Sequence, residues 1–463
     1  MNEETGSRRV TIGNDAAGNI VISGDGNTIT VHHFRAITET CVEGLPRPDE
    51  APEIGPNPYK GLSAFTESDA DRFFGRETLT GEIWERFRRL YTTDGAVRFL
   101  GILGPSGSGK SSVARAGLIP ELARQSIPTV GAFRVAVIRP GSHPVEELAR
   151  TLGQLRDDGP KSMAWADQFE ERMWAGAPEG PWEGLRRAGD ELPDIDQRPL
   201  IIVVDQLEEL FTLIERGDDP ESREKTEAER RAFIGNLIGA AGDRSRRVSV
   251  VVTLRSDFLG DVNRHPELSR LVSDQGIIVP AMGPDDLRRA IAEPARRAGH
   301  PLDAPTVDLL ISQAEGHDGA LPLLEFALEQ IWNGMADGKA PADTLRELGG
   351  VGGALAHKAE EIYTDLDPHE RKIARRAFLK LVRLGEGTRD TRRRVAVDDM
   401  VAHGESPEQV YRVLRRFSDP GARLVTLTHQ TASTQSPSMD STESDRAPCS
   451  QNGKPEEHRP APV

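Results

Sequence analysis

Apolar residues between positions 97 and 279 fall into five short continuous runs, which alternate with stretches of helical periodicity. A continuous apolar run is typical of a strand buried on both faces, and strands that alternate with helices form a parallel sheet covered on both sides. The pattern therefore predicts an α/β fold with a five-stranded parallel sheet. The predicted strands are 97–103, 133–138, 200–204, 248–254 and 276–279.

Beyond residue 283 the pattern is helical. Two helix starts are well marked, Asp367-Pro368 with Glu370 and Ser406-Pro407 with Gln409, because each has a capping side chain, proline at the first position and an acid or amide at the third. We expect a helical lid and then a winged-helix-like domain, whose strand at 423–427 has no obvious returning partner. The predicted helical stretches are 57–97 after an extended start, 144–198, 221–241, 284–298, 304–337 and part of 353–430.

The two ends of the chain have a different composition. Three β-branched runs separated by glycine and asparagine turns predict a short hairpin or meander, or a stacked β-coil, that docks on a partner or self-associates. A proline-rich linker follows, and the last residues contain too few apolar side chains to fold. The predicted organisation is a β segment 1–35, a linker 36–56, an α/β domain 57–282, a helical lid 283–352, a winged-helix-like domain 353–430 and a disordered tail 431–463.

Composition limits the class of protein. The 463 residues exceed one ordinary domain, and a net charge of −16 disfavours nucleic acid and anionic membranes as partners. With two cysteines there is no disulfide framework, and neither an apolar signal core nor a membrane span is apparent. We expect a cytoplasmic protein.

Residues 104–111 read GPSGSGKS and lie between a predicted strand and a predicted helix. This is the context that identifies a phosphate-binding P-loop, because backbone N–H groups and the helix start surround the phosphates. Lys110 is expected to reach the β- and γ-phosphates, and the Ser111 hydroxyl to ligate Mg²⁺. The nucleotide-binding residues of the loop are Gly104, Pro105, Ser106, Gly107, Ser108, Gly109, Lys110, Ser111 and Ser112.

The strand at 200–204 ends in Asp205, whose carboxylate can hold Mg²⁺ through water. Many hydrolysing P-loop enzymes have a glutamate next, which orients the attacking water, but here the position is Gln206. Glu208 and Glu209 follow. From the residues alone we prefer Glu209 for the water, while the alternative is that both acids only cap and solvate the next helix start.

The strand at 248–254 ends in Arg255, which in a sheet beside the P-loop is placed to sense the γ-phosphate. The alternative is a simple ion pair with Asp257 or exposure to solvent. Two further segments, FFGRE at 73–77 and GALPLL at 319–324, are weak signals when taken alone.

The ordered set of NPYKGL at 57–62, FFGRE, GPSGSGKS, VVDQLEELF at 203–211, TLRSDF at 253–258 and GALPLL resembles the STAND NTPases. More narrowly, it is similar to the class-one novel STAND group of bacterial multidomain signalling and defence proteins, over roughly residues 57–430. The resemblance implies a sheet of order 5-1-4-3-2 with a helical lid and a winged helix. It also implies ATP or ADP with Mg²⁺ as ligands, the adenine choice being further supported by the absence of an N-K-x-D motif.

The resemblance also implies roles for single residues. Phe74, Gly75 and Arg76 would lie beside the adenine, and Pro322 would touch the base or ribose. Asp205 would be the magnesium acid, Glu208 and Glu209 the water-orienting pair, and Arg255 the sensor arginine.

Such proteins resemble slow ATP-driven switches, in which ADP holds a closed form and ATP opens a form that assembles into a homo-oligomer. We therefore expect a slow regulatory ATPase in signalling or defence, with an unknown effector or sensor protein recruited through the N-terminal segment. The family usually continues into a sensor array such as WD-type repeats, which this chain lacks, so truncation, a frameshift or a sensing partner is expected.

Two alternatives stay open. A nucleotide-dependent transcription regulator would bind DNA through the basic run 389–394 with Arg412, Arg415 and Arg416, although the acidic chain makes nucleic acid the less favoured partner. An AAA-type remodelling ATPase is the other, but no pore-loop aromatic pair or clear arginine finger stands out.

Overall fold

The computed structural model of the protein describes residues 54–427, apart from gaps at 126, 128–129, 131, 157–158, 160, 177–179, 213–219, 317–318, 384–390, 393–394, 419–423 and 426. The chain divides into two units, 1–53 and 54–463, and every described residue belongs to the second. The predicted β segment 1–35, nearly all of the linker 36–56 and the predicted tail 431–463 lie outside the described residues.

Five parallel strands form the sheet, in the order β2-β3-β4-β1-β5. This order, read from the other edge, is the expected 5-1-4-3-2, and all five predicted strands are present with shifts of at most a few residues at their ends. The strands are β1 (Phe99–Gly104), β2 (Arg134–Ile138), β3 (Leu200–Val204), β4 (Val248–Arg255) and β5 (Gly276–Ile278).

Helices connect these strands and cover both faces of the sheet. The helix after β1 is irregular, because its second turn, Val113–Leu118, is π-helical. The connecting elements are η1 (Glu67–Asp69), α1 (Glu77–Thr92), α2 (Lys110–Ser112), η2 (Val113–Leu118), α3 (Ile119–Arg124), α4 (Pro144–Arg156), α5 (Ser162–Trp174), α6 (Gly184–Asp190), α7 (Glu209–Thr212), α8 (Pro220–Gly242), η3 (Ser256–Phe258), α9 (Leu259–Val262) and α10 (Pro266–Gln275).

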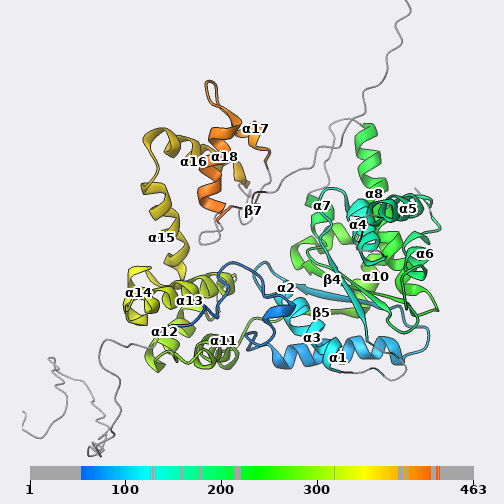
Figure 1. The fold of residues 1–463 in the computed structure, drawn as a ribbon, viewed down its shortest axis with the longest axis horizontal. Coiled ribbons are helices and arrows are strands. Elements are labelled where there is room, and N and C mark those ends of the chain that lie inside the picture. Colours follow the sequence, from blue (N-terminus) through cyan, green and yellow to red (C-terminus); the bar gives the residue numbers. More distant parts are fainter. Residues whose placement is uncertain are drawn as a thin grey trace, which may run out of the picture. The chain divides into compact units, whose positions relative to one another are not determined.

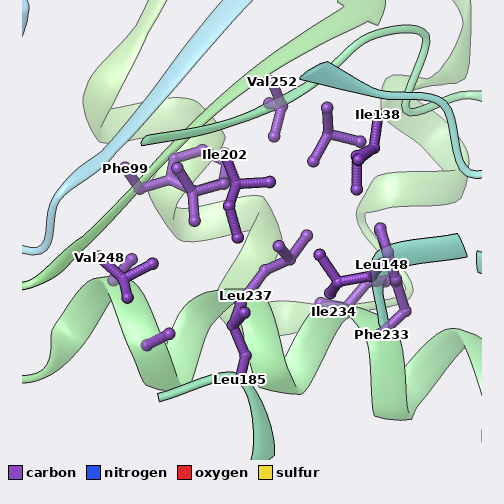
Figure 2. Packing of buried hydrophobic residues seen from close by; sticks show 14 of the residues in the cluster. Phe99, Ile138, Leu148, Leu185, Ile202, Phe233, Ile234, Leu237, Val248 and Val252 are labelled. Carbon is purple, nitrogen blue, oxygen red and sulfur yellow. The ribbon is translucent and has the colours of Figure 1, made fainter. Parts of the chain in front are cut away.

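The strands alternate their side chains between two cores, as a pleated strand must. In β3, Ile202 packs into the core shared with α4, α6, α8 and α10, whereas Ile201 and Val203 pack against α1, η2 and α3. Figure 1 shows these helices on the two sides of the sheet. Figure 2 shows Ile202 and Val252 of the sheet facing Phe233, Ile234 and Leu237 of α8. Because both faces are buried, the strands are mostly apolar, and the charged residues Asp205 and Arg255 lie where strands end.

The helical region after the sheet has a core of its own. Tyr59 from the opening motif packs into this core with residues of the next four helices. These helices are α11 (Pro284–Arg297), α12 (Ala304–Ala314), α13 (Ala320–Ala336) and α14 (Pro341–Glu347).

The C-terminal module consists of α15 (Gly350–Thr364), α16 (Pro368–Leu381), α17 (Val397–Met400), α18 (Pro407–Ser418) and a two-stranded antiparallel ladder, β6 (Val382–Arg383) with β7 (Thr391–Arg392). Both predicted helix starts are present. Asp367 and Glu370 form a capping box, and Ser406 and Gln409 exchange the corresponding hydrogen bonds.

The strand expected at 423–427 is not formed by the residues of that segment that the structure describes. Leu424 and Val425 form a bend, and their N–H groups donate to the Phe417 carbonyl at 2.8 and 3.2 Å. The hairpin pairing lies instead before α17, where the arginine-rich sequence was interpreted as a basic surface.

No helix within the described ranges is long and apolar enough to cross a membrane.

Candidate nucleotide site

The loop between β1 and α2 has the backbone conformation that phosphate binding requires. Gly107 and Gly109 have φ angles of 76° and 89°, in the left-handed region that residues with a Cβ rarely adopt. Gly109 is the N-cap of α2, so the first turn of this helix points its N–H groups into the loop. The Lys110 ammonium donates to the Pro105 carbonyl at 2.8 Å and is 8% exposed, so its charge is held inside the loop.

A cluster of hydroxyl and carboxylate groups joins the loop to the two neighbouring strand ends. Asp205 is fully buried, and its Oδ1 accepts from the Ser111 hydroxyl at 2.5 Å and from the Thr253 hydroxyl at 2.8 Å. Gln206 has a φ of 63° and its N–H donates to the same Thr253 hydroxyl, which turns the chain sharply after Asp205. The structure thus brings together the two residues predicted to hold Mg²⁺.

Arg139 is a site residue that the sequence reasoning missed. It follows the last residue of β2, and its Nη2 and Nε lie 3.3 and 3.4 Å from Oδ2 of Asp205. The only signal in the sequence is an arginine directly after a buried strand. Since β2 and β3 are neighbours in the sheet, that position faces the end of β3.

The two candidate water-orienting acids point in different directions. Oε2 of Glu208 accepts from the Arg255 backbone N–H at 3.3 Å, and Oε2 of Glu209 accepts from the Gly141 N–H at 3.0 Å. Burial raises the pKa of Glu208, and the nearby Lys110 ammonium opposes that shift. Burial likewise lowers the pKa of Lys110, with Glu208 opposing it. Glu208 is therefore the acid that interacts with the P-loop lysine, while Glu209 faces the loop after β2.

Arg255 lies directly beside Gly104, the first residue of the P-loop, in the register of β4 with β1. Its guanidinium pairs with Asp257, with Nη2 to Oδ2 at 2.5 Å, and lies 5.3 Å from the centre of the Phe258 ring. The ion pair of Arg255 with Asp257 is thus present, next to the P-loop. It was the alternative to phosphate sensing.

The segment at 74–76 touches both the P-loop and α11. Arg76 is 4% exposed and donates to the Ser108 and Pro280 carbonyls at 3.0 and 2.9 Å, and its burial lowers its pKa. Gly75 has a φ of 79°, and a Cβ there would lie 2.3 Å from the Asp286 carbonyl oxygen. The Phe74 ring lies under the guanidinium of Arg297 at 4.5 Å.

Ser112 follows Ser111, the proposed magnesium ligand, and its hydroxyl contacts the segment after the opening motif. The Phe65 backbone N–H donates to the Ser112 hydroxyl at 3.2 Å. The chain that follows the opening motif is therefore attached to the first turn of the helix that begins in the P-loop.

The start of α13 packs directly on the P-loop. A Cβ on Gly107 would lie 3.1 Å from Cα of Gly319 and 3.3 Å from Cδ of Pro322. Pro322, expected near the base or ribose, therefore lies against the phosphate loop itself, and a side chain at 107 would be disfavoured both by this close contact and by the positive φ.

The site fits a nucleotide with Mg²⁺. The buried hydroxyl of Ser108 has no hydrogen-bond partner among the described residues, which leaves it available to a bound phosphate. Within the same residues no cluster of three or more histidine, cysteine or acidic side chains forms a metal site. One hydroxyl and one carboxylate are the donor set of a Mg²⁺ that obtains its other ligands from phosphates and water.

Three of the arginines considered for DNA binding, Arg412, Arg415 and Arg416, lie on one face of α18. Arg416 interacts with Asp365 and Glu370, at 3.9 and 3.8 Å, and Arg412 and Arg415 are exposed on α18. Most of the basic run 389–394 lies outside the described residues.

Solved structures that resemble this chain include two ORC proteins of low sequence identity. Among solved structures, the chain is similar to Drosophila ORC bound to DNA, with 12% identity, 82% of each chain covered and a TM-score of 0.38. It is also similar to the Aeropyrum pernix ORC2 protein in ADPNP–ADP complexes, with 14% identity, 75% of this chain and 86% of that chain covered, and a TM-score of 0.40. A search of curated proteins finds no match.

The family model of Novel STAND NTPase 1 matches residues 58–440, which is most of the chain. The sheet order, the P-loop and the acid at the end of β3 agree with a nucleotide-hydrolysing member of that family. The chain is a P-loop ATPase and belongs to the Novel STAND NTPase 1 family.

Proposed function

We propose that this ATPase is a slow molecular switch in signalling or defence, which binds ATP or ADP with Mg²⁺ and changes its domain arrangement with the nucleotide. ADP holds the closed form, and ATP favours a form that assembles into a homo-oligomer. The single observation that carries the proposal is the contact of Gly319 and Pro322 with Gly107, because it joins the helical region to the loop that holds the phosphates.

The Ser111 hydroxyl and the Asp205 carboxylate would hold Mg²⁺, which neutralises charge on the β- and γ-phosphates when bound. Lys110 would bind the same phosphates from inside the loop, and the backbone N–H groups of 104–112 would surround them. The Thr253 hydroxyl fixes the orientation of Asp205.

Glu208 is the better placed of the two acids to orient the attacking water. It is buried, it interacts with Lys110, and its Oε2 accepts from the backbone of the sensor arginine. Glu209 is engaged by the Gly141 N–H. We therefore assign the water to Glu208, in place of the Glu209 that the residues alone favoured, and give Glu209 a positioning role for the loop after β2.

Arg255 would respond to the γ-phosphate. Its backbone is fixed beside Gly104, while its side chain pairs with the partly exposed carboxylate of Asp257 and lies over the Phe258 ring. A partly exposed pair contributes only about 0–1 kcal/mol, so a γ-phosphate can compete for the guanidinium. The ion pair with Asp257 is thus the resting state of a sensor.

The nucleoside would be held by the segments that flank the loop. Phe74 and Gly75 contact α11, and Arg76 joins the P-loop to the end of β5. These contacts support the expectation that 74–76 lie beside the adenine and that Pro322 contacts the nucleotide from the helical side.

The test is to identify the nucleotide that co-purifies with the protein and to follow its single-turnover hydrolysis, beside Lys110→Ala. A switch retains ADP and hydrolyses ATP slowly, in a reaction lost in Lys110→Ala. Rapid multiple turnover from an empty site would contradict the switch and favour a remodelling ATPase instead.

A further inference from the structure

Arg139 lies at the edge of the nucleotide site, and neither the family motifs nor the proposed mechanism gives it a task. Its side chain is 53% exposed, yet it reaches a carboxylate that is 1% exposed. The contact is made by two nitrogens of one guanidinium to one oxygen, Oδ2 of Asp205. An exposed arginine therefore makes a direct ion pair with a buried acid, and Lys110 and Arg115 add positive charge nearby.

The two oxygens of Asp205 have different partners. Oδ1 accepts from the hydroxyls of Ser111 and Thr253, both of which the fold holds in place. Oδ2 has Arg139 as its partner in the described part of the chain. Oδ2 is thus the oxygen of this carboxylate that accepts from neither hydroxyl, so it would be available to a water on a metal held at Ser111, and Arg139 contacts it.

We propose that Arg139 is a built-in counter-ion that competes with Mg²⁺ for Oδ2 of Asp205 and so sets the Mg²⁺ concentration at which nucleotide is retained. The proposal rests on the Mg²⁺–nucleotide site proposed above. A buried carboxylate without a nearby cation is unfavourable. When the metal is absent, Arg139 places positive charge at Asp205. This lowers the free-energy cost of metal dissociation.

The loop that carries Arg139 contacts two acidic residues that follow β3, Asp205 and Glu209. The Gly141 N–H donates to Glu209, two residues beyond the contact of Arg139 with Asp205, and α4 begins at Pro144. When the metal replaces Arg139 at Asp205, the loop therefore loses its contact with Asp205 and keeps its contact with Glu209. The state of the metal site is communicated to α4 by this route.

The experiment measures the dissociation of a fluorescent ADP analogue from the full chain as free Mg²⁺ is varied. In Arg139→Gln the Mg²⁺ concentration for half-maximal retention should fall about fivefold, which corresponds to about 1 kcal/mol for a lost partly exposed ion pair. Arg139→Lys keeps the charge and should stay near wild type. The control is Arg150→Gln, which removes an exposed arginine of α4 that pairs with Glu147.

A second readout needs no nucleotide. Without Mg²⁺, Arg139→Gln should melt at a lower temperature than wild type because Asp205 has lost its counter-ion, and added Mg²⁺ should narrow that gap. A gap that Mg²⁺ leaves unchanged, or an unchanged or higher Mg²⁺ requirement for ADP retention, would overturn the proposal. A wild-type chain that binds no ADP at any Mg²⁺ concentration would instead overturn the proposed function itself.

Discussion

Two acidic residues in the described part of the chain, Asp205 and Glu325, differ in the number of donors around their carboxylates. Asp205, at the end of β3, receives two hydroxyls and a guanidinium. The Glu325 carboxylate, on α13, accepts a hydrogen bond from the Lys60 backbone N–H at 3.4 Å and lies near Glu329. Burial, reinforced by Glu329, raises the pKa of Glu325 to about 7.

The number of donors explains the difference. A carboxylate that is surrounded by donors in a strand-end cluster keeps an acceptor ready for a cation. A carboxylate packed between a helix and a peptide segment gains little from its charge and binds a proton more readily. The first carboxylate is the one proposed to hold a ligand, whereas the contact made by the second has a strength that depends on pH.

The largest effect is expected from the acid beside the P-loop. Glu208→Gln should slow single-turnover ATP hydrolysis by about 10²-fold or more, because a positioned base contributes on the order of 10²–10⁴. Glu209→Gln is the matched control and should retain most of the rate, since its carboxylate contacts the Gly141 N–H. If Glu209→Gln is the slower of the two, the assignment of the water to Glu208 is wrong.

Asp205→Asn tests the cluster of hydroxyl and guanidinium donors around the carboxylate at the end of β3. The amide can still contact Ser111 but has lost the charge, so the apparent Mg²⁺ affinity in the presence of ADP should fall about 10–100-fold. Isothermal titration of Mg²⁺ into the ADP complex measures it. An unchanged affinity would mean that the metal is not held at the end of β3.

A smaller effect is expected where the helical region touches the loop. Gly107→Ala forces a Cβ into the left-handed region and against Gly319 and Pro322, and ADP release should accelerate about tenfold. Gly338→Ala has the same backbone strain, with a φ of 80° and nothing within 4 Å of the added Cβ, so it separates strain from contact. Equal release rates in the two variants would argue against coupling through this contact.

The smallest effect concerns Glu325. Because its folded pKa of about 7 lies above the ordinary value of 4.5, the folded state holds the proton more tightly and stability falls as pH rises from about 4.5 through 7. Glu325→Gln removes this loss, so its melting temperature should exceed that of wild type by a few degrees more at pH 8 than at pH 5. The exposed Glu82→Gln variant should show no such dependence. If the melting temperatures of Glu325→Gln and wild type differ by the same amount at pH 5 and at pH 8, the raised pKa of Glu325 is contradicted.

The sheet and its ligand loop were predictable because each rests on local sequence. Buried parallel strands are apolar runs, so their order of appearance and their ends at Gly104, Asp205 and Arg255 could be read directly. Capped helices such as the one after Asp367 were predictable for the same reason, since the cap and the helix are neighbours in the chain. The ladder of β6 with β7 was missed, because strands of two residues carry no apolar pattern.

By itself, the sequence predicted a P-loop, a candidate magnesium acid at the end of a buried strand and five parallel strands, while the order 5-1-4-3-2 came from the resemblance to the STAND NTPases. Only the tertiary structure decided which oxygen of Asp205 faces Arg139, that Glu208 rather than Glu209 interacts with Lys110, and that Pro322 packs on Gly107. The physical reason is one of range. Strand periodicity and loop glycines act over a few residues of chain, whereas the direction of a side chain at a strand end depends on neighbouring strands that are distant in sequence.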